Sequence, residues 1–141
     1  MSNVQLRVAA KAVISHKGKI LIVREAKTYQ DGSQYGKYGL PGGRIEADEP
    51  FFDALSREVK EEVGLSIKPI RPVYVGEWWP EIKGVKNHIV AMFILCESSS
   101  DKVTLSDEHD HYEWISPRDY KKYEMMDPDD NVIAQIRKYQ N

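Results

Sequence analysis

Residues 57–64 read Arg-Glu-Val-Lys-Glu-Glu-Val-Gly and place three glutamates within five positions. In a helix, residues three or four positions apart share a face, so Glu58, Glu61 and Glu62 would lie within an arc of roughly 100° at 3.6 residues per turn. Like charges at this spacing destabilise a helix by about 0.2–0.5 kcal/mol per pair. The stretch therefore indicates that a positively charged partner faces these carboxylates.

The residues around this stretch have the apolar period of a helix, which we expect over 50–63. On a helical wheel the apolar stripe lies beside the glutamate arc, so one side can pack on a core while the carboxylates face a neighbouring cleft. Gly64 would end the helix, because glycine adopts the left-handed conformation common after the last helical residue. The stripe consists of Phe52, Leu55, Val59 and Val63.

Alternation of apolar and polar residues, with Leu6, Val8, Ala10, Ala12 and Ile14 on one face, predicts a half-buried first strand. The run 19–25 predicts a second strand, so 6–25 would form a hairpin that turns at Gly18. Residues 26–39 read as a loop, and 39–46 as too rich in glycine and proline for a regular element. Further strands are expected at 72–79, 88–97 and 111–116, and a closing helix at 127–139 with Asp127 as N-cap and Pro128 at its first position.

Length and composition are typical of one globular domain, which we expect to cover residues 1–141. The net charge of −2 argues against a protein that grips nucleic acid by neutralising phosphates, although a metal could still bring a nucleotide to the site. The single cysteine, Cys96, excludes an intramolecular disulfide and reads as a buried thiol. No signal-peptide pattern and no apolar run of about 20 residues is evident, so we expect a cytoplasmic protein without a membrane partner.

The spacing Gly43-x5-Glu49-x7-Arg57-Glu58-Val59-x-Glu61-Glu62-x-Gly64-Leu65 resembles the Nudix box at every defined position. This resemblance implies an α/β fold, an α/β/α sandwich with a mixed β-sheet. It also implies hydrolysis of the pyrophosphate bond in a nucleoside diphosphate linked to another group. By the same resemblance Glu58, Glu61 and Glu62 are metal ligands and Gly43 offers a backbone carbonyl. Arg57 would pair with Glu49 and fix the loop to the helix.

The chemistry of the residues is consistent with this resemblance. Clustered carboxylates are tolerated when a hard divalent cation neutralises them, and an open set of oxygen ligands suits Mg²⁺, with Mn²⁺ as a substitute. The glycine pair before the helix would let the backbone approach the metal or a phosphate closely. We expect a catalytic set of Glu61, Glu62, Arg57 and Glu108, with Glu108 as a further ligand or the general base. His109 and His111 read as loop histidines, since no closed zinc ligand set is evident.

Aromatic residues that could stack on a base occur in two stretches, and stacking contributes about 1–3 kcal/mol per base. We consider Tyr29, Tyr35 and Tyr38 in the first loop, and Trp78 and Trp79 further on. Because successive strand residues face opposite sides, one tryptophan at most should reach the cleft, and the other would suit the core or a homodimer interface. Arg44, beside the glycine pair, is a further candidate substrate contact.

The substrate remains open at this point. Pro80 lies near the position of a marker proline in related ADP-ribose hydrolases, which favours ADP-ribose or nucleotide sugars. The alternatives are (deoxy)nucleoside triphosphates and dinucleoside polyphosphates. Tyr38, where many family members have tryptophan, and Asp48, where glycine is common, leave the subfamily undecided. From other classes we consider a non-catalytic nucleotide-sensing module and an isomerase of the same fold, which would need a reactive cysteine.

Overall fold

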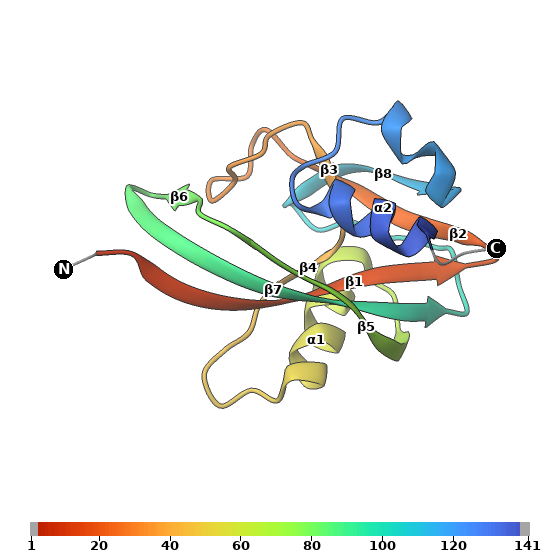
Figure 1. Cartoon of the computed structure of the whole chain (residues 1–141), viewed down its shortest axis with the longest axis horizontal. Coiled ribbons are helices and arrows are strands. Elements are labelled where there is room, and N and C mark those ends of the chain that lie inside the picture. Colours follow the sequence, from red (N-terminus) through yellow and green to blue (C-terminus); the bar gives the residue numbers. More distant parts are fainter. Residues whose placement is uncertain (1–2, 139–141) are drawn as a thin grey trace.

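The computed structural model describes residues 3–138, in which a mixed β-sheet lies between two α-helices (Figure 1). Two long central strands, β1 (Gln5–His16) and β7 (Val85–Ser98), run parallel to each other. The other strand pairs are antiparallel. Strand β1 pairs with β2 (Lys19–Glu25) and β4 (Gly42–Arg44), and β2 pairs in turn with β3 (Tyr38–Gly39) and β8 (His109–Ile115). Strand β7 pairs with β5 (Ile67–Trp78) and β6 (Glu81–Ile82).

The two helices cover opposite faces of the sheet. One core cluster joins α1 (Phe51–Val63) to the sheet through Leu55, Val59 and Val63. The other joins α2 (Asp129–Lys138) to the opposite face through Val132, Ile133 and Ile136. A short 3₁₀ helix, η1 (Pro117–Lys122), precedes α2. The predicted α/β/α sandwich with a mixed sheet is therefore confirmed. No helix within residues 3–138 is long and apolar enough to cross a membrane.

The first strand differs from its prediction because both of its faces are covered. Ala10, Ala12 and Ile14 contact the α1 side, whereas Ala9 and Val13 contact the α2 side. The prediction of a half-buried strand was wrong, since β1 lies inside the sheet between two helical layers. The hairpin itself is confirmed, with β1 and β2 paired at Ser15–Ile20 and a positive φ of 78° at Gly18.

The helix α1 begins at Phe51 and ends as predicted, with Gly64 at φ 73° and its N–H donating to the Lys60 carbonyl. Phe52 does not join the apolar stripe, because its side chain is 51% exposed. Its neighbour Phe51 packs against the core instead, and the two rings meet edge-on at 5.3 Å.

Other boundaries also move. The end of the predicted loop forms the short strand β3, and the glycine- and proline-rich segment contains β4. Both were missed, because each is a pairing of only two or three residues and Pro41 lies between them. The strand β5 starts five residues earlier than predicted and passes Pro69 and Pro72 through shifts of register. The closing helix starts at Asp129, after Pro128, and position 139 of that prediction lies outside the described residues. The Asp127 carboxylate accepts a hydrogen bond from the Asn131 side-chain amide.

Candidate active site

A cavity of about 280 Å³ opens beside the glycine pair and the acidic face of α1. Its walls come from segments that are distant in sequence: β1, the loop after β2, the turn before β4, α1, the end of β5 and the start of β8. Carboxylates line it from several of these segments. They belong to Glu25, Asp31, Glu46, Glu58, Glu62 and Glu108.

The three box glutamates of α1 do not all face this cavity. Glu58 and Glu62 line it, and Glu62 is only 5% exposed. Glu61 is absent from its lining, and the Glu61 side chain is 59% exposed and pairs with the Arg57 guanidinium at 3.2 Å. Glu61 therefore stays a predicted ligand whose side chain the structure leaves outside the cavity.

Two glycines allow the backbone to approach these carboxylates. The Gly42 N–H donates to Glu62 Oε2 at 2.6 Å, and the Gly42 φ of 136° is one that other residues rarely adopt. A Cβ atom at Gly43 would lie 2.5 Å from Glu58 Oε2, so a side chain there would displace that carboxylate. The glycine pair thus brings the backbone against the Glu58 and Glu62 carboxylates, and its approach to a metal or a phosphate stays a prediction.

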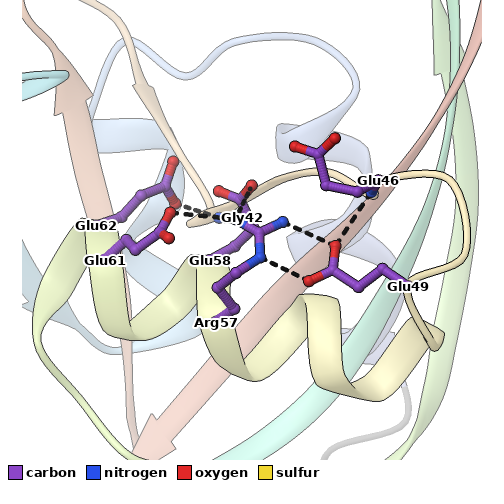
Figure 2. A network of polar contacts seen from close by, with 7 residues as sticks. All are labelled: Gly42, Glu46, Glu49, Arg57, Glu58, Glu61 and Glu62. Atoms are coloured by element: carbon purple, nitrogen blue, oxygen red, sulfur yellow. Dashed lines mark hydrogen bonds and ion pairs between the residues drawn. The ribbon is translucent and has the colours of Figure 1, made fainter.

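Arg57 ties the loop before α1 to the acidic face, as predicted from the family resemblance (Figure 2). Its guanidinium donates to both carboxylate oxygens of Glu49, with N–O distances of 2.6 and 2.9 Å. The same side chain also donates to Glu58 at 3.1 Å. The Arg57 guanidinium holds the pKa of Glu49 down at about 2. Arg57 thus orients Glu58 while its charge offsets part of the carboxylate repulsion.

Glu62, Glu108 and His109 form a compact cluster in which one ligand atom of each lies within 4.8 Å of the others. Burial, together with a hydrogen bond and charge repulsion from Glu108, raises the pKa of Glu62 well above its usual range. Burial also raises the pKa of Glu58. Burial lowers the pKa of His109 to about 4, so this ring is neutral at pH 7. Its Nδ1 atom is buried without a hydrogen-bond partner among the described residues.

These observations fit a divalent cation. The pKa values of Glu58 and Glu62 stay raised despite the Arg57 and Lys11 charges, so further positive charge would stabilise both carboxylates. Oxygen donors are those that hard divalent cations prefer. Glu58, Glu62 and Glu108 meet in one cavity, and Gly43 places its backbone beside Glu58. The residues that could hold the cation are therefore the two inward glutamates of α1, Glu108 and the Gly43 carbonyl.

The candidate substrate contacts are only partly brought to the cavity. Trp78, Arg44 and Tyr29 line it. Trp79 is 56% exposed and stacks on His88 at 4.6 Å, so the two tryptophans diverge as strand alternation predicted. Tyr35 is 45% exposed, and Tyr38 packs edge-on against Tyr123 at 5.4 Å. The described residues that line the cavity do not include Tyr35, Tyr38 or Trp79.

Sequence reasoning missed Lys11 and Glu25, which also line the cavity. Lys11 read as a polar residue on the solvent face of a half-buried strand. Ala9 and Val13 on that same face were the available signal, because apolar residues on both sides of Lys11 indicate a covered face. Glu25 ends β2 and accepts a hydrogen bond from the Gln34 N–H in the following loop. The position of Glu25 in the cavity depends on how the loop after β2 folds, which the sequence does not indicate.

Comparison with known proteins connects this geometry to a family. A family model described as the NUDIX domain matches residues 5–136. The nucleoside triphosphatase NudI of Escherichia fergusonii is 29% identical over 97 residues, which cover 64% of this chain and 69% of that protein.

Solved structures show the same architecture. The MutT protein from Methanosarcina mazei Go1 superimposes with a TM-score of 0.79 and 26% identity, and the match covers 100% of both chains. An ADP-ribose pyrophosphatase from Streptococcus suis shares the fold with a TM-score of 0.66 and 24% identity, over 93% of this chain and 87% of that one. Proteins named for different substrates are thus similar to this chain, one in sequence and another in fold.

Proposed function

The chain belongs to the NUDIX family of hydrolases, and we propose on this premise that it cleaves a phosphoric anhydride bond of a small nucleotide with a bound divalent cation. The observation that carries the proposal is the meeting of Glu58, Glu62 and Glu108 in one cavity beside the Gly43 backbone. Mg²⁺ is the cation that we propose, with Mn²⁺ as a substitute, because open sets of oxygen ligands suit both ions.

We assign the residues of the site different roles in the reaction. Glu58, Glu62, Glu108 and the Gly43 carbonyl would hold the cation, and Glu61 is a further proposed ligand. A bound cation would offset charge on the phosphate oxygens and favour ionisation of water. Arg57 orients Glu58 through its contact at 3.1 Å, and the Gly42 N–H orients Glu62. The alternative role for Glu108 is that of the base, since it lies beside Glu62 within the same cluster.

The cavity also bears on the substrate class. About 280 Å³ lies near the lower limit of the roughly 300–1,000 Å³ that is usual for ligand pockets. This size favours a nucleotide with one nucleoside over a dinucleoside polyphosphate. Trp78 offers a stacking surface and Arg44 a cation toward phosphate. Pro80 lines the same cavity, which supports an ADP-ribose type of substrate, whereas the name of the E. fergusonii relative supports a nucleoside triphosphate.

Mass spectrometry of the products formed from a nucleotide pool with Mg²⁺ tests this function. The pool contains ADP-ribose, nucleotide sugars, nucleoside triphosphates and dinucleoside polyphosphates. AMP with ribose 5-phosphate identifies the ADP-ribose class, and a monophosphate with pyrophosphate identifies the triphosphate class. Glu62→Gln should lower turnover by about 10² or more, because a lost cation contact costs several kcal/mol of barrier. Glu81→Gln, an exposed position on β6, is the matched control.

A protein that turned over no member of the pool, yet was thermally stabilised by one of them, would contradict hydrolysis. It would identify the chain as a nucleotide-sensing module. A Glu62→Gln variant with full activity would place the reaction elsewhere in the molecule.

A further inference from the structure

Lys11 lies on the covered α2 face of β1 and has no place in the cation site described above. Its side chain is only 12% exposed, yet it lines the cavity. The ammonium lies 3.6 Å from the Asp129 carboxylate, and that side chain is 1% exposed. A lysine is rarely buried unless it is paired, so this pair explains how Lys11 can remain charged inside the protein.

Asp129 is held firmly in place. Its Oδ2 atom accepts a hydrogen bond from the Leu40 N–H at 2.7 Å. A Cβ atom at Gly39 would lie 2.8 Å from the same oxygen, so glycine leaves room for the carboxylate. Asp129 does not itself line the cavity. Of the two side chains, only that of Lys11 is therefore available to a ligand in the cavity, and Asp129 holds its ammonium in position.

Lys11 also lies between two different parts of the cavity. Within the sheet it is paired with Gly42, whose N–H donates to Glu62 on the cation side. Burial raises the pKa values of Glu25 and Glu62, and the Lys11 charge opposes that rise, so the ammonium lies within electrostatic reach of both carboxylates. On the α2 side, Asp129 and Gly39 adjoin Met126, and Ile89 and Trp78, which belong to the cluster on that face, line the same cavity. Apolar and aromatic surface of this kind suits a nucleoside.

The charge balance of the cavity favours a phosphate contact by a fixed cation of the protein. Among the described residues that line it, the basic side chains are those of Lys11 and Arg44, against six carboxylates. Arg44 is exposed, whereas the Lys11 side chain is only 12% exposed and pairs with Asp129. A lysine ammonium has three N–H donors, so two remain after one is directed to Asp129.

We propose that Lys11 donates a hydrogen bond to a non-bridging oxygen of the phosphate attached to the nucleoside, and that Asp129 is its positioning residue. This inference rests on the proposed function, because it assumes that the ligand is a nucleotide. It adds a contact that does not pass through the divalent cation. The contact would distinguish a nucleotide from a nucleoside at the boundary between the two parts of the cavity.

Binding of AMP and adenosine, measured by calorimetry in Mg²⁺, tests the contact, since AMP has no anhydride bond to be cleaved. Lys11→Met should weaken AMP binding by about 10- to 100-fold, the range for hydrogen bonds to charged groups, and leave adenosine binding unchanged. The Lys11→Met variant leaves the Asp129 carboxylate without its partner, and the double variant Lys11→Met/Asp129→Asn removes that charge as well. The double variant should lose the same amount of AMP affinity as Lys11→Met. Asp129→Asn should weaken AMP binding in the wild-type background but not in Lys11→Met, a coupling that a merely structural role would not produce.

Two results would overturn the inference. One is a Lys11→Met protein that keeps the wild-type preference for AMP over adenosine, which would make Lys11 only a counter-ion for Asp129. The other is a wild-type protein without any such preference. The product assay on the nucleotide pool separates the two proposals. If the protein hydrolyses a nucleotide but its AMP preference does not depend on Lys11, the proposed function holds and the contact is refuted. If the AMP preference depends on Lys11 but no nucleotide is hydrolysed, the contact holds and the proposed function is refuted.

Discussion

Gly42 and Gly43 show how single residues set the geometry of this site. A Cβ atom at Gly42 would lie 2.2 Å from the Ala10 carbonyl, and one at Gly43 would lie 2.5 Å from a Glu58 oxygen. Both distances are far below ordinary van der Waals contact. The missing side chains thus allow β4 to lie against β1 while the α1 carboxylates reach the cavity beside it.

Glu61 provides the sharpest test among single residues, because the family resemblance makes it a ligand while its side chain pairs with Arg57 outside the cavity. We expect Glu61→Gln to lower kcat by about 10² or more with folding intact, since the loss of a cation contact costs several kcal/mol of barrier. Steady-state kinetics together with circular dichroism would check this. A near-full rate would remove Glu61 from the ligand set and leave Glu58, Glu62 and Glu108.

Cys96 is fully buried on β7, and burial raises the pKa of its thiol to about 12. Since the thiolate is the reactive form, we expect no alkylation by iodoacetamide at pH 8 in the folded protein and complete alkylation in denaturant. Intact-mass spectrometry would measure the extent of alkylation in the folded and in the denatured protein. Rapid labelling of the native protein that a nucleotide prevents would instead revive the isomerase alternative.

At the scale of elements, α1 packs on the sheet with one side and presents carboxylates with the adjoining side. Leu55, Val59 and Val63 are fully buried against the sheet, and Glu58 and Glu62 lie along the neighbouring edge. The preceding loop is attached to this helix by the two hydrogen bonds from Arg57 to Glu49. The helix and the loop therefore position the acidic face as one unit.

The Arg57–Glu49 attachment predicts a pH dependence of stability. The pKa of Glu49 is lowered to about 2 in the folded protein, below its ordinary value of 4.5, because Arg57 favours the carboxylate. Its contribution to the free energy of unfolding is therefore fully present above about pH 4.5 and is lost as the pH falls toward 2. Urea denaturation of the wild-type protein and Glu49→Gln should show a difference at pH 6 that shrinks between pH 4.5 and 2.

Arg57→Lys is the matched control for this prediction, because it keeps the charge but cannot donate the two parallel hydrogen bonds. It should reproduce part of the loss seen with Glu49→Gln. A stability difference between wild-type and Glu49→Gln that did not change with pH would mean that the pair contributes nothing as an ion pair.

At the scale of the whole molecule, the site exists only where the two sides of the sandwich meet at the sheet. Glu58 and Glu62 belong to the layer of α1, Asp129 to that of α2, and Lys11 to the strand between them. Glu108 comes from the segment just before β8. Like charges gathered in this way store repulsion that a bound cation relieves.

We therefore expect Mg²⁺ or Mn²⁺ to raise Tm and EDTA to reverse the effect. A ligand that binds only the folded state at 100 times its Kd stabilises a protein by about 2.7 kcal/mol. The rise should vanish in Glu58→Gln/Glu62→Gln, which should itself be at least as stable as wild-type in EDTA, because buried like charges have been removed. Differential scanning fluorimetry would measure both. An unaltered metal-dependent rise in the double variant would place the cation elsewhere.

Much of the fold and of the cation site could be predicted where the information is local. The spacing of Leu55, Val59 and Val63 relative to the glutamates determined a helix with an apolar and an acidic side, and Gly64 determined its end. The pairing of Arg57 with Glu49 followed from the family pattern over eight residues and is confirmed. These features depend on the helical period and on one glycine conformation, which the chain carries within a short segment.

Contacts between distant segments were decided by the tertiary structure alone. The meeting of Lys11 with Asp129 and the outward placement of the Glu61 side chain have no signature along the chain. The sequence likewise did not determine which of the two tryptophans would face outward. These placements depend on which strands pair and on which face each helix covers. Apolar neighbours such as Ala9 and Val13 can indicate that the face of Lys11 is covered, but they do not identify the group that covers it. Only the packing of the covering layer determines whether the side chain becomes part of a site.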